Sequence, residues 1–266
     1  MSLDLNHLAH EALDGAESVP LLIAHGLYGS ARNFNSLGKR LARDRPVIMV
    51  DMRNHGESPW NDEMTYAAMA HDLARAIERE CDGRAAVLGH SMGGKAAMAL
   101  ALTRPDLVSA LMVADIAPVA YDHSHDGYIS AMQQIDLSQV RRRSDADPML
   151  AGGVDEPMLR SFLLQNLLVE GGQARWRLNL DALEAALPEL MSWPSEWPEP
   201  AYEGPCLFIH GTASDYVEEA AHPRIRALFP DVTFAPIAGA GHWLHAEAPE
   251  AFLATVSEFL AAVPRG

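Results

Sequence analysis

RAAVLGHSMGGKAAMAL, residues 84–100, is the stretch that decides the fold. It joins a short apolar run, typical of a buried strand, to a run of good helix formers, with GHSMG (residues 89–93) between them. A sharp turn from strand to helix strains its central residue, and small flanking residues remove the clashes that would block it. We therefore predict that Ser91 stands at a helix N-terminus, clear of a sheet, as a nucleophile.

Short apolar runs bounded by Gly, Pro or Asp recur along the chain, with segments of helical spacing between them. This alternation predicts an α/β fold, in which a mostly parallel sheet of seven or eight strands carries helices on both faces. Apolar residues recur every three or four positions from Tyr66 to Ile77, so we expect a helix there, with Thr65 as its N-cap. The expected strands are Pro20–His25, Pro46–Asp51, Arg84–Gly89, Leu107–Asp115, Pro205–His210 and Val232–Ile237, with an edge strand within Leu3–Leu13.

The segment 118–200 interrupts this alternation, because it holds helical stretches without a clear strand. Helices are expected at Glu156–Leu168 and at Asp181–Leu187, and the prolines that close the segment predict an extended return to the sheet. We therefore predict two domains. One is an α/β core made of residues 1–117 and 201–266, and the other is an inserted helical cap made of residues 118–200.

A serine hydroxyl needs a positioned base to take its proton, and His242 is the best candidate among the twelve histidines. It stands in AGAGHW (residues 238–243), after the last expected strand and before a terminal helix. In folds built around this turn the base follows the last strand. Small residues before the histidine let its loop fold back across the sheet edge. The competing His245, three residues on, is expected to be structural.

Two aspartates are candidates for the acid that orients His242. Asp115 ends the strand after the nucleophile strand, and Asp215 follows the next strand along the chain. An acid at the second place usually lies three residues after the glycine that ends the strand, but Ser214 holds that position counted from Gly211. Spacing leaves both candidates open and slightly favours Asp115, because Asp215 is out of register.

Two backbone N–H groups are needed to stabilise the oxyanion of a tetrahedral intermediate, and losing one costs about 3–4 kcal/mol of barrier. Met92, directly after the serine, is expected to supply the first. The second is expected from Leu27 in HGLYGS (residues 25–30), where glycines let the backbone approach a substrate. We expect His25 to brace this loop rather than to exchange protons with the substrate.

Charge and composition exclude several classes of function. The formal net charge of -16 disfavours binding to nucleic acids and anionic membranes, and no segment resembles a secretory signal or a membrane span. The isolated Cys81 and Cys206 indicate a reducing cytoplasm rather than a disulfide framework. His123 and His125 lie among aspartates but match no metal-binding signature, so we predict no metal site.

Together these motifs resemble small bacterial esterases of the YbfF type and, more distantly, the abhydrolase-domain-11 type, both members of the α/β-hydrolase superfamily. The resemblance rests on HGLYGS, GHSMGGK and AGAGHW, and on DMRNHG (residues 51–56) and DIAP (residues 115–118). It implies that Asp115 is the acid and that a helical cap lies over the site. It also implies hydrolysis of acyl esters, often of short or medium chain, with thioester cleavage also seen and with no cofactor.

The predicted function is therefore hydrolysis of small-molecule carboxylic esters through an acyl-serine intermediate on Ser91. Acyl thioesterase activity is an alternative, as are C–C bond hydrolysis and perhydrolysis, which use the same triad and which the cap sequence does not separate. A non-catalytic receptor that binds a ligand under the cap is a further alternative. A dehalogenase is disfavoured because it needs Asp where Ser91 stands.

Overall fold

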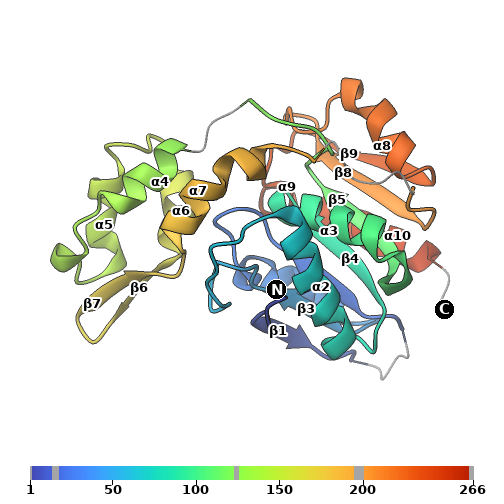
Figure 1. Cartoon of the computed structure of the whole chain (residues 1–266), viewed down its shortest axis with the longest axis horizontal. Helices are drawn as coiled ribbons and strands as arrows, with labels where there is room; N and C mark the ends of the chain where they lie inside the picture. Colours follow the sequence, from blue (N-terminus) through green and yellow to red (C-terminus); the bar gives the residue numbers. More distant parts are fainter. Residues whose placement is uncertain (1, 14–17, 123–125, 195–200, 264–266) are drawn as a thin grey trace.

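A seven-stranded sheet forms the centre of the protein in the computed structural model, which describes residues 2–13, 18–122, 126–194 and 201–263 (Figure 1). Its strands are β1 (His7–His10), β2 (Leu21–Ala24), β3 (Val47–Val50), β4 (Ala85–His90), β5 (Val108–Ala114), β8 (Cys206–Gly211) and β9 (Val232–Ile237). Their order in the sheet is β1-β3-β2-β4-β5-β8-β9, and all neighbours are parallel except β1 and β3. The predicted mostly parallel α/β sheet is confirmed, and the expected edge strand is β1.

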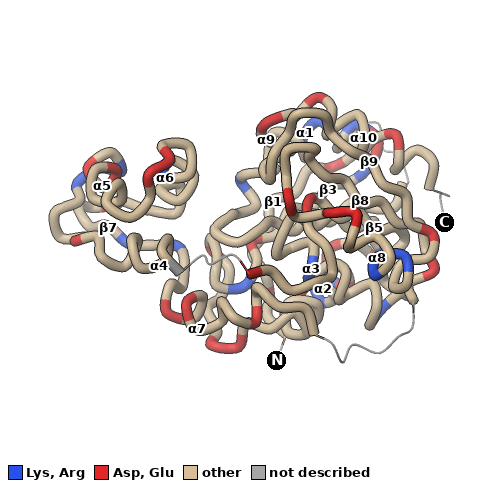
Figure 2. The backbone as a smooth tube through the Cα atoms, turned by 90° about the horizontal axis from the view of Figure 1, so that it is seen from above, with Lys and Arg blue, Asp and Glu red and all other residues tan. Residues whose placement is uncertain are grey.

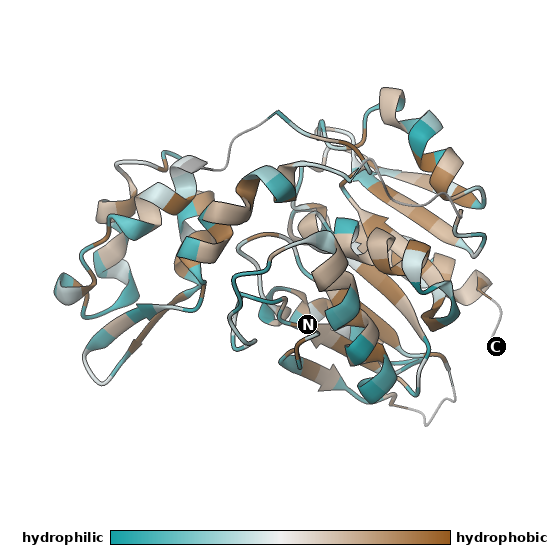
Figure 3. Ribbon diagram, viewed as in Figure 1, coloured by the Kyte–Doolittle hydropathy of each residue, from teal (hydrophilic) through white to brown (hydrophobic). Residues whose placement is uncertain are grey.

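Helices cover both faces of the sheet, as predicted. Side chains of α1 (Asn35–Leu41) and α10 (Pro249–Ala262) pack on one face. Those of α2 (Tyr66–Glu80), α3 (Met92–Thr103) and α8 (His222–Leu228) pack on the other. Because the central strands are covered on both sides, their residues are apolar in both directions, and Figure 3 shows these strands mostly in brown.

The turn after β3 and the start of α2 are held by local hydrogen bonds. Thr65 is the N-cap of α2, and its side chain accepts the Ala68 N–H over 3.1 Å, as expected. The Asp51 carboxylate accepts backbone N–H groups from two other segments. Arg53 forms a fully buried ion pair with Asp72 on α2. These charged groups stabilise the loop after β3, which contacts the loop after β2 through the hydrogen bond from the Met52 N–H to His25 Nε2.

Between β5 and β8 the chain leaves the sheet and forms a separate layer, which we call the insertion (residues 118–194). Figure 1 shows this layer beside the sheet, with α7 running back toward the core. Its elements are α4 (Asp126–Gln133), α5 (Arg143–Leu150), α6 (Pro157–Leu164), β6 (Leu167–Glu170), β7 (Gln173–Trp176) and α7 (Leu180–Met191).

The insertion is mainly helical, as expected, but it also contains a hairpin that the sequence pattern does not predict. Strands β6 and β7 pair antiparallel, and Gly171 and Gly172 between them both have positive φ. The expected helix Glu156–Leu168 is therefore wrong at its C-terminal end, because this glycine pair favours a hairpin turn. The expected helix Asp181–Leu187 is confirmed within α7. The extended return expected at 193–200 lies mostly outside the described residues.

Acidic and basic residues are mixed over the surface of both parts. Figure 2 shows Asp and Glu on the core and on the insertion, with Lys and Arg interspersed among them. The arginine run at the start of α5 is locally compensated, since Arg142 pairs with Asp145 over 3.0 Å. No helix in the described part of the chain is long and apolar enough to cross a membrane.

Candidate active site

The turn between β4 and α3 holds Ser91 in a strained backbone conformation, with φ 52° and ψ -121°. Two glycines make this turn possible. A Cβ on Gly89 would overlap the Gly93 carbonyl group, and a Cβ on Gly93 would overlap the Ala24 carbonyl group. The glycines of the GHSMG pattern therefore have a steric cause, and the serine hydroxyl stands at the positive end of α3.

His242 reaches Ser91 from the loop between β9 and the short helix α9 (Leu244–Glu247). Its Nε2 lies 3.1 Å from Ser91 Oγ. Two side chains hold the backbone of this loop. His90 Nε2 donates to the His242 carbonyl oxygen over 2.9 Å, and the Glu247 carboxylate accepts the N–H groups of the residues on either side of His242. The imidazole is thus held where it can accept the serine proton.

Asp115, directly after β5, is the carboxylate that contacts His242. Its side chain is fully buried, and its Oδ2 lies 2.8 Å from His242 Nδ1. Its Oδ1 accepts the Gly211 N–H over 3.0 Å, and Ser214 Oγ donates to Oδ2. The alternative acid, Asp215, is exposed and makes no side-chain hydrogen bond or ion pair with the described residues. In three dimensions Asp115 contacts His242 and Asp215 does not, a difference that the spacing of the sequence leaves open.

The loop after β2 lies directly against the nucleophile turn. A Cβ on Gly26 would lie 3.0 Å from Ser91 Cβ, so this close approach requires glycine. The N–H groups of Leu27 and Met92 donate no hydrogen bond to other described residues, which leaves both free for an oxyanion. His25 braces the loop as expected, because its Nδ1 donates to the Gly26 carbonyl oxygen over 2.8 Å and its Nε2 accepts a backbone N–H over 2.9 Å.

Burial lowers the pKa of three further histidines around the site, His25, His90 and His245. For His245 burial lowers the pKa to about 4, so this ring is neutral at physiological pH. The His245 ring stacks on Phe34, with ring centroids 4.4 Å apart, instead of contacting Ser91. Of the two histidines that follow β9, His242 contacts the serine and His245 packs on Phe34.

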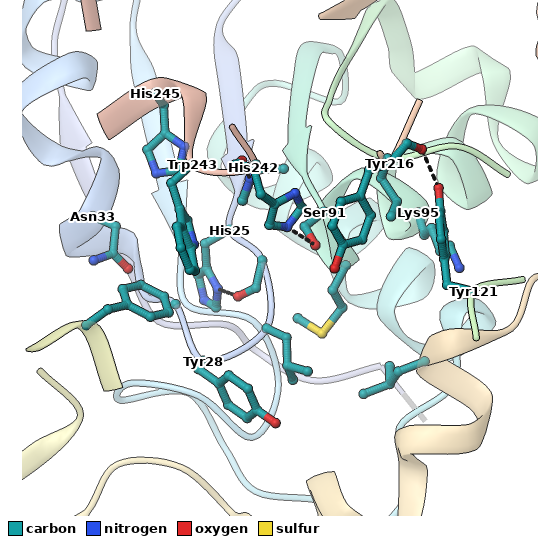
Figure 4. Close-up of a pocket in the computed structure, with 18 of the residues that line it drawn as sticks. His25, Tyr28, Asn33, Ser91, Lys95, Tyr121, Tyr216, His242, Trp243 and His245 are labelled. Atoms are coloured by element: carbon teal, nitrogen blue, oxygen red, sulfur yellow. Dashed lines mark hydrogen bonds between the residues drawn. The ribbon is translucent and has the colours of Figure 1, made fainter. Parts of the chain in front are cut away.

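A cavity of about 210 Å³ lies over Ser91, between the core and the insertion. Its walls are mainly aromatic and apolar. Figure 4 shows Asn33 and Trp243 to one side of the serine and Tyr121 and Lys95 to the other. The insertion residues that complete the wall are Tyr128, Leu159, Phe162, Leu190 and Met191.

The sequence matches a model of a known protein family over most of its length. A family model described as the alpha/beta hydrolase fold matches residues 19–249. The chain belongs to the α/β-hydrolase family. The match extends from β2 to the start of α10, and so it includes the nucleophile turn, the Asp115 and His242 loops and the whole insertion.

Several relatives are similar along nearly the whole chain. A Mus musculus protein named sn-1-specific diacylglycerol lipase ABHD11 is 42% identical over 263 residues, which cover 96% of this chain and 85% of the relative. The Escherichia coli esterase YbfF is 38% identical, over 97% of this chain and 99% of the relative. A solved structure of a marine microorganism esterase is 38% identical, with a TM-score of 0.91, and the match covers 97% of this chain and all of that one. The predicted resemblance to YbfF-type esterases is confirmed.

Sequence reasoning assigns no role to Ser214 or Tyr216, although both contact the proposed triad. The Ser214 hydroxyl donates to Asp115 Oδ2, the oxygen that also contacts His242. The ring of Tyr216 stacks on the His242 imidazole, with centroids 4.0 Å apart. The signal for Ser214 is its position three residues after Gly211, where an acid is common and where a polar group therefore faces the base. No comparable signal marks Tyr216.

Lys95 on α3 also escapes sequence reasoning, because it lies within a run of helix formers. Its side chain is 1% exposed, and its Nζ donates to the Ser192 carbonyl oxygen over 2.6 Å. The ammonium lies 4.8 Å from the centroid of the Tyr121 ring and 5.6 Å from that of Tyr66. Burial lowers the pKa of Lys95 to about 7, an effect that the charge of Glu189 partly opposes. A buried amine therefore stands in the cavity wall.

Possible metal ligands and the two cysteines are the remaining groups that could carry chemistry. Within the described part of the chain, no group of three or more His, Cys, Asp or Glu side chains is placed to hold a metal ion. His123 and His125 lie outside the described residues. Cys81 and Cys206 are free and buried, and burial raises the pKa of Cys81 to about 12, so its thiol is not ionised at neutral pH.

Proposed function

We propose that this chain hydrolyses carboxylic esters of small molecules through an acyl-enzyme intermediate on Ser91. One observation carries the proposal. The imidazole of His242 lies 3.1 Å from Ser91 Oγ through Nε2 and 2.8 Å from Asp115 Oδ2 through Nδ1. This arrangement lets the histidine accept the serine proton, while the carboxylate holds the tautomer and stabilises the imidazolium that forms.

Acylation begins when Ser91 Oγ attacks the ester carbonyl carbon and passes its proton to His242 Nε2. As the new C–O bond forms, the carbonyl π electrons move to oxygen, and the free N–H groups of Leu27 and Met92 stabilise this oxyanion. The tetrahedral intermediate then collapses. The bond to the leaving alcohol breaks, and its oxygen takes the proton from His242, so that Ser91 keeps the acyl group.

Deacylation repeats these steps with water as the nucleophile. His242 takes a proton from water, the hydroxide equivalent attacks the acyl carbon, and the Ser91 oxygen leaves with the proton that His242 returns. The Gly211 N–H and the Ser214 hydroxyl both donate to the Asp115 carboxylate and so keep it oriented toward His242. The proposed reaction needs no cofactor.

An ester of short or medium acyl length fits this site best. The E. coli relative is named an esterase and the mouse relative a diacylglycerol lipase, which supports an ester as the substrate class. A cavity of about 210 Å³ with aromatic walls supports an apolar acyl group of limited length. Acyl thioesters pass through the same acyl-enzyme, so they belong in the test of this proposal.

We also propose that the insertion, within the segment 118–200, acts as a cap that excludes water from the reaction. Six of its residues, Tyr121 among them, line the cavity over Ser91, which supports this role. Its α7 approaches the core near α3, as Figure 1 shows.

The free thiols of Cys81 and Cys206 support the cytoplasmic location that the sequence predicts.

Release of p-nitrophenol from esters of increasing acyl length, together with a parallel series of acyl-CoA thioesters, tests the proposal. We expect turnover of at least one series that falls on the order of a millionfold in Ser91→Ala. Ser109→Ala is the matched control, because it removes another buried serine hydroxyl, on β5, that has no hydrogen-bond partner among the described residues. Wild-type rates no higher than those of Ser91→Ala with every substrate would reject the proposed function.

A further inference from the structure

Consecutive carbonyl groups at the C-terminal end of α7 are held by groups from outside that helix. The last carbonyls of a helix have no partner within it and need donors from elsewhere. Here the Tyr66 hydroxyl on α2 donates to the Leu190 carbonyl oxygen over 2.6 Å. Lys95 Nζ on α3 donates to the Ser192 carbonyl oxygen over 2.6 Å, and the Tyr121 N–H donates to the carbonyl between them. The core thus holds the point where the insertion ends.

Lys95 is an unusual donor for this purpose. Burying a charge is costly unless it is paired or well hydrogen-bonded, and no carboxylate of the described residues lies within ion-pair distance of Lys95 Nζ. The ammonium is stabilised instead by the negative end of α7 and by the faces of the Tyr66 and Tyr121 rings. Lys95 and the end of α7 therefore depend on each other for their positions.

The end of α7 closes one side of the cavity over Ser91. Lys95 and Tyr66 also line this side. On the other side of Ser91, Phe162 and Trp243 line both this cavity and a separate groove of about 520 Å³ beside α6. The groove beside Trp243 offers room for a leaving alcohol, so this side suits the leaving group. The closed side then receives the acyl chain.

We propose that the C-terminal end of α7 is the end wall of the acyl side, and that Tyr66 and Lys95, by holding this wall, set the longest acyl chain accepted. This inference rests on the proposed ester hydrolysis. Apolar side chains yield to a longer chain by changing rotamer. A wall whose carbonyl groups accept hydrogen bonds from buried donors resists displacement by a longer acyl chain. Moving it would leave both the donors and the carbonyl groups buried without partners.

The acyl-length profiles of Tyr66→Phe and Lys95→Met test this assignment. Each substitution keeps most of the side-chain volume and removes a donor to the end of α7. We expect kcat/KM for p-nitrophenyl octanoate, divided by that for the butyrate, to rise about tenfold in either variant. Tyr202→Phe is the matched control, because it removes a buried tyrosine hydroxyl that donates to the Val108 carbonyl oxygen over 3.2 Å, away from the cavity. It should keep the wild-type ratio.

An unchanged octanoate-to-butyrate ratio in Tyr66→Phe overturns the assignment, and this variant decides alone if Lys95→Met does not fold. A change in preference among leaving groups, at constant acyl length, also overturns it, because the two sides of the cavity would then be exchanged. Neither result bears on whether wild-type protein hydrolyses esters, which the comparison with Ser91→Ala measures separately.

A second measurement does not depend on turnover. p-Nitrophenyl methylphosphonate and octylphosphonate esters place their alkyl group in the acyl position when they react with Ser91. We expect Tyr66→Phe to accelerate labelling by the octyl reagent relative to the methyl reagent. A wild-type protein that reacts with these reagents but turns over no ester rejects the proposed function, while the labelling ratio still decides the end wall. If neither reagent labels Ser91, both proposals fail.

Discussion

The core and the insertion constrain their residues in different ways. In the core, β4 and β5 are paired up to His90 and Ala114, so Ser91 and Asp115 leave the sheet at the same edge. In the insertion, short helices and one hairpin replace this ladder, and two of the helices, α5 and α7, contain an internal proline. This difference indicates that the order of the strands in the core determines where the reacting groups lie. The room for a substrate depends on the insertion and on its junction with the core.

Of the predictions that compare core and insertion, the largest expected change in activity comes from replacing the proposed acid in the core. Asp115→Asn should lower kcat/KM by about 10⁴ at neutral pH, because the buried amide no longer holds the His242 tautomer that accepts the serine proton. Asp215→Asn, in the exposed loop after β8, should stay within about twofold of wild type. Steady-state kinetics with a p-nitrophenyl ester measure both, and the opposite order would exchange the two aspartates.

The next prediction concerns the junction between the two parts, where Lys95 is buried. It is a shift in the pKa of the Lys95 amine. The sequence contains one other lysine, Lys39, which is exposed, so a protein labelled with ¹³C at lysine Cε gives one buried signal and one exposed control. Burial lowers the pKa of Lys95 from 10.5 to about 7. We expect the buried signal to titrate near neutral pH. A buried signal that titrates near 10.5 instead would show that the Lys95 amine is hydrated.

The same shift predicts how stability depends on pH. Because the folded pKa lies below the unfolded one, the unfolded chain binds more protons than the folded chain between about pH 7 and 10.5. The Lys95 contribution to the free energy of unfolding should therefore rise across this window, by up to about 1.4 kcal/mol per pH unit, and stay constant below it. The difference between wild type and Lys95→Met in urea unfolding at several pH values isolates this contribution.

A matched pair of leucines compares the packing of the two parts directly. Leu88 on β4 and Leu183 on α7 are both fully buried, so Leu88→Ala and Leu183→Ala should each cost about 2–5 kcal/mol in the part that holds them. We expect hydrogen exchange to accelerate throughout the chain for Leu88→Ala. For Leu183→Ala the acceleration should be confined to the insertion. Equal acceleration in the sheet strands for both variants would show that core and insertion unfold as one unit.

The smallest effect concerns Ser214, which supports the acid. Ser214→Ala should lower kcat/KM about tenfold, because a hydrogen bond to a charged group is worth about 1.5 kcal/mol or more. Ser214→Thr keeps the hydroxyl and should restore most of the rate. Ser138→Ala in the insertion, whose hydroxyl bonds to Asp136, is the control and should be silent. If Ser214→Ala keeps wild-type kcat/KM, the hydrogen bond from Ser214 to Asp115 does not contribute to catalysis.

Much of the core could be predicted from sequence because its signals are local. Apolar runs mark the strands, and the turn around Ser91 needs glycines for a steric reason that the sequence displays. The acid is harder to identify, since both Asp115 and Asp215 follow strands whose ends meet at one edge, and only three-dimensional contacts separate them. The hairpin of the insertion is missed because a short apolar run after a helix is ambiguous. Lys95 and Tyr216 are missed because their partners are distant in sequence.

Covalent labelling tests the central claim most directly, namely that His242 and Asp115 activate Ser91. A fluorophosphonate probe, followed by peptide mass spectrometry, should modify Ser91 alone in the wild-type protein. Labelling should be slowed by orders of magnitude in His242→Ala and Asp115→Asn, and unchanged in Asp215→Asn. An adduct on another residue, or a labelling rate in His242→Ala equal to that of wild type, would contradict the account.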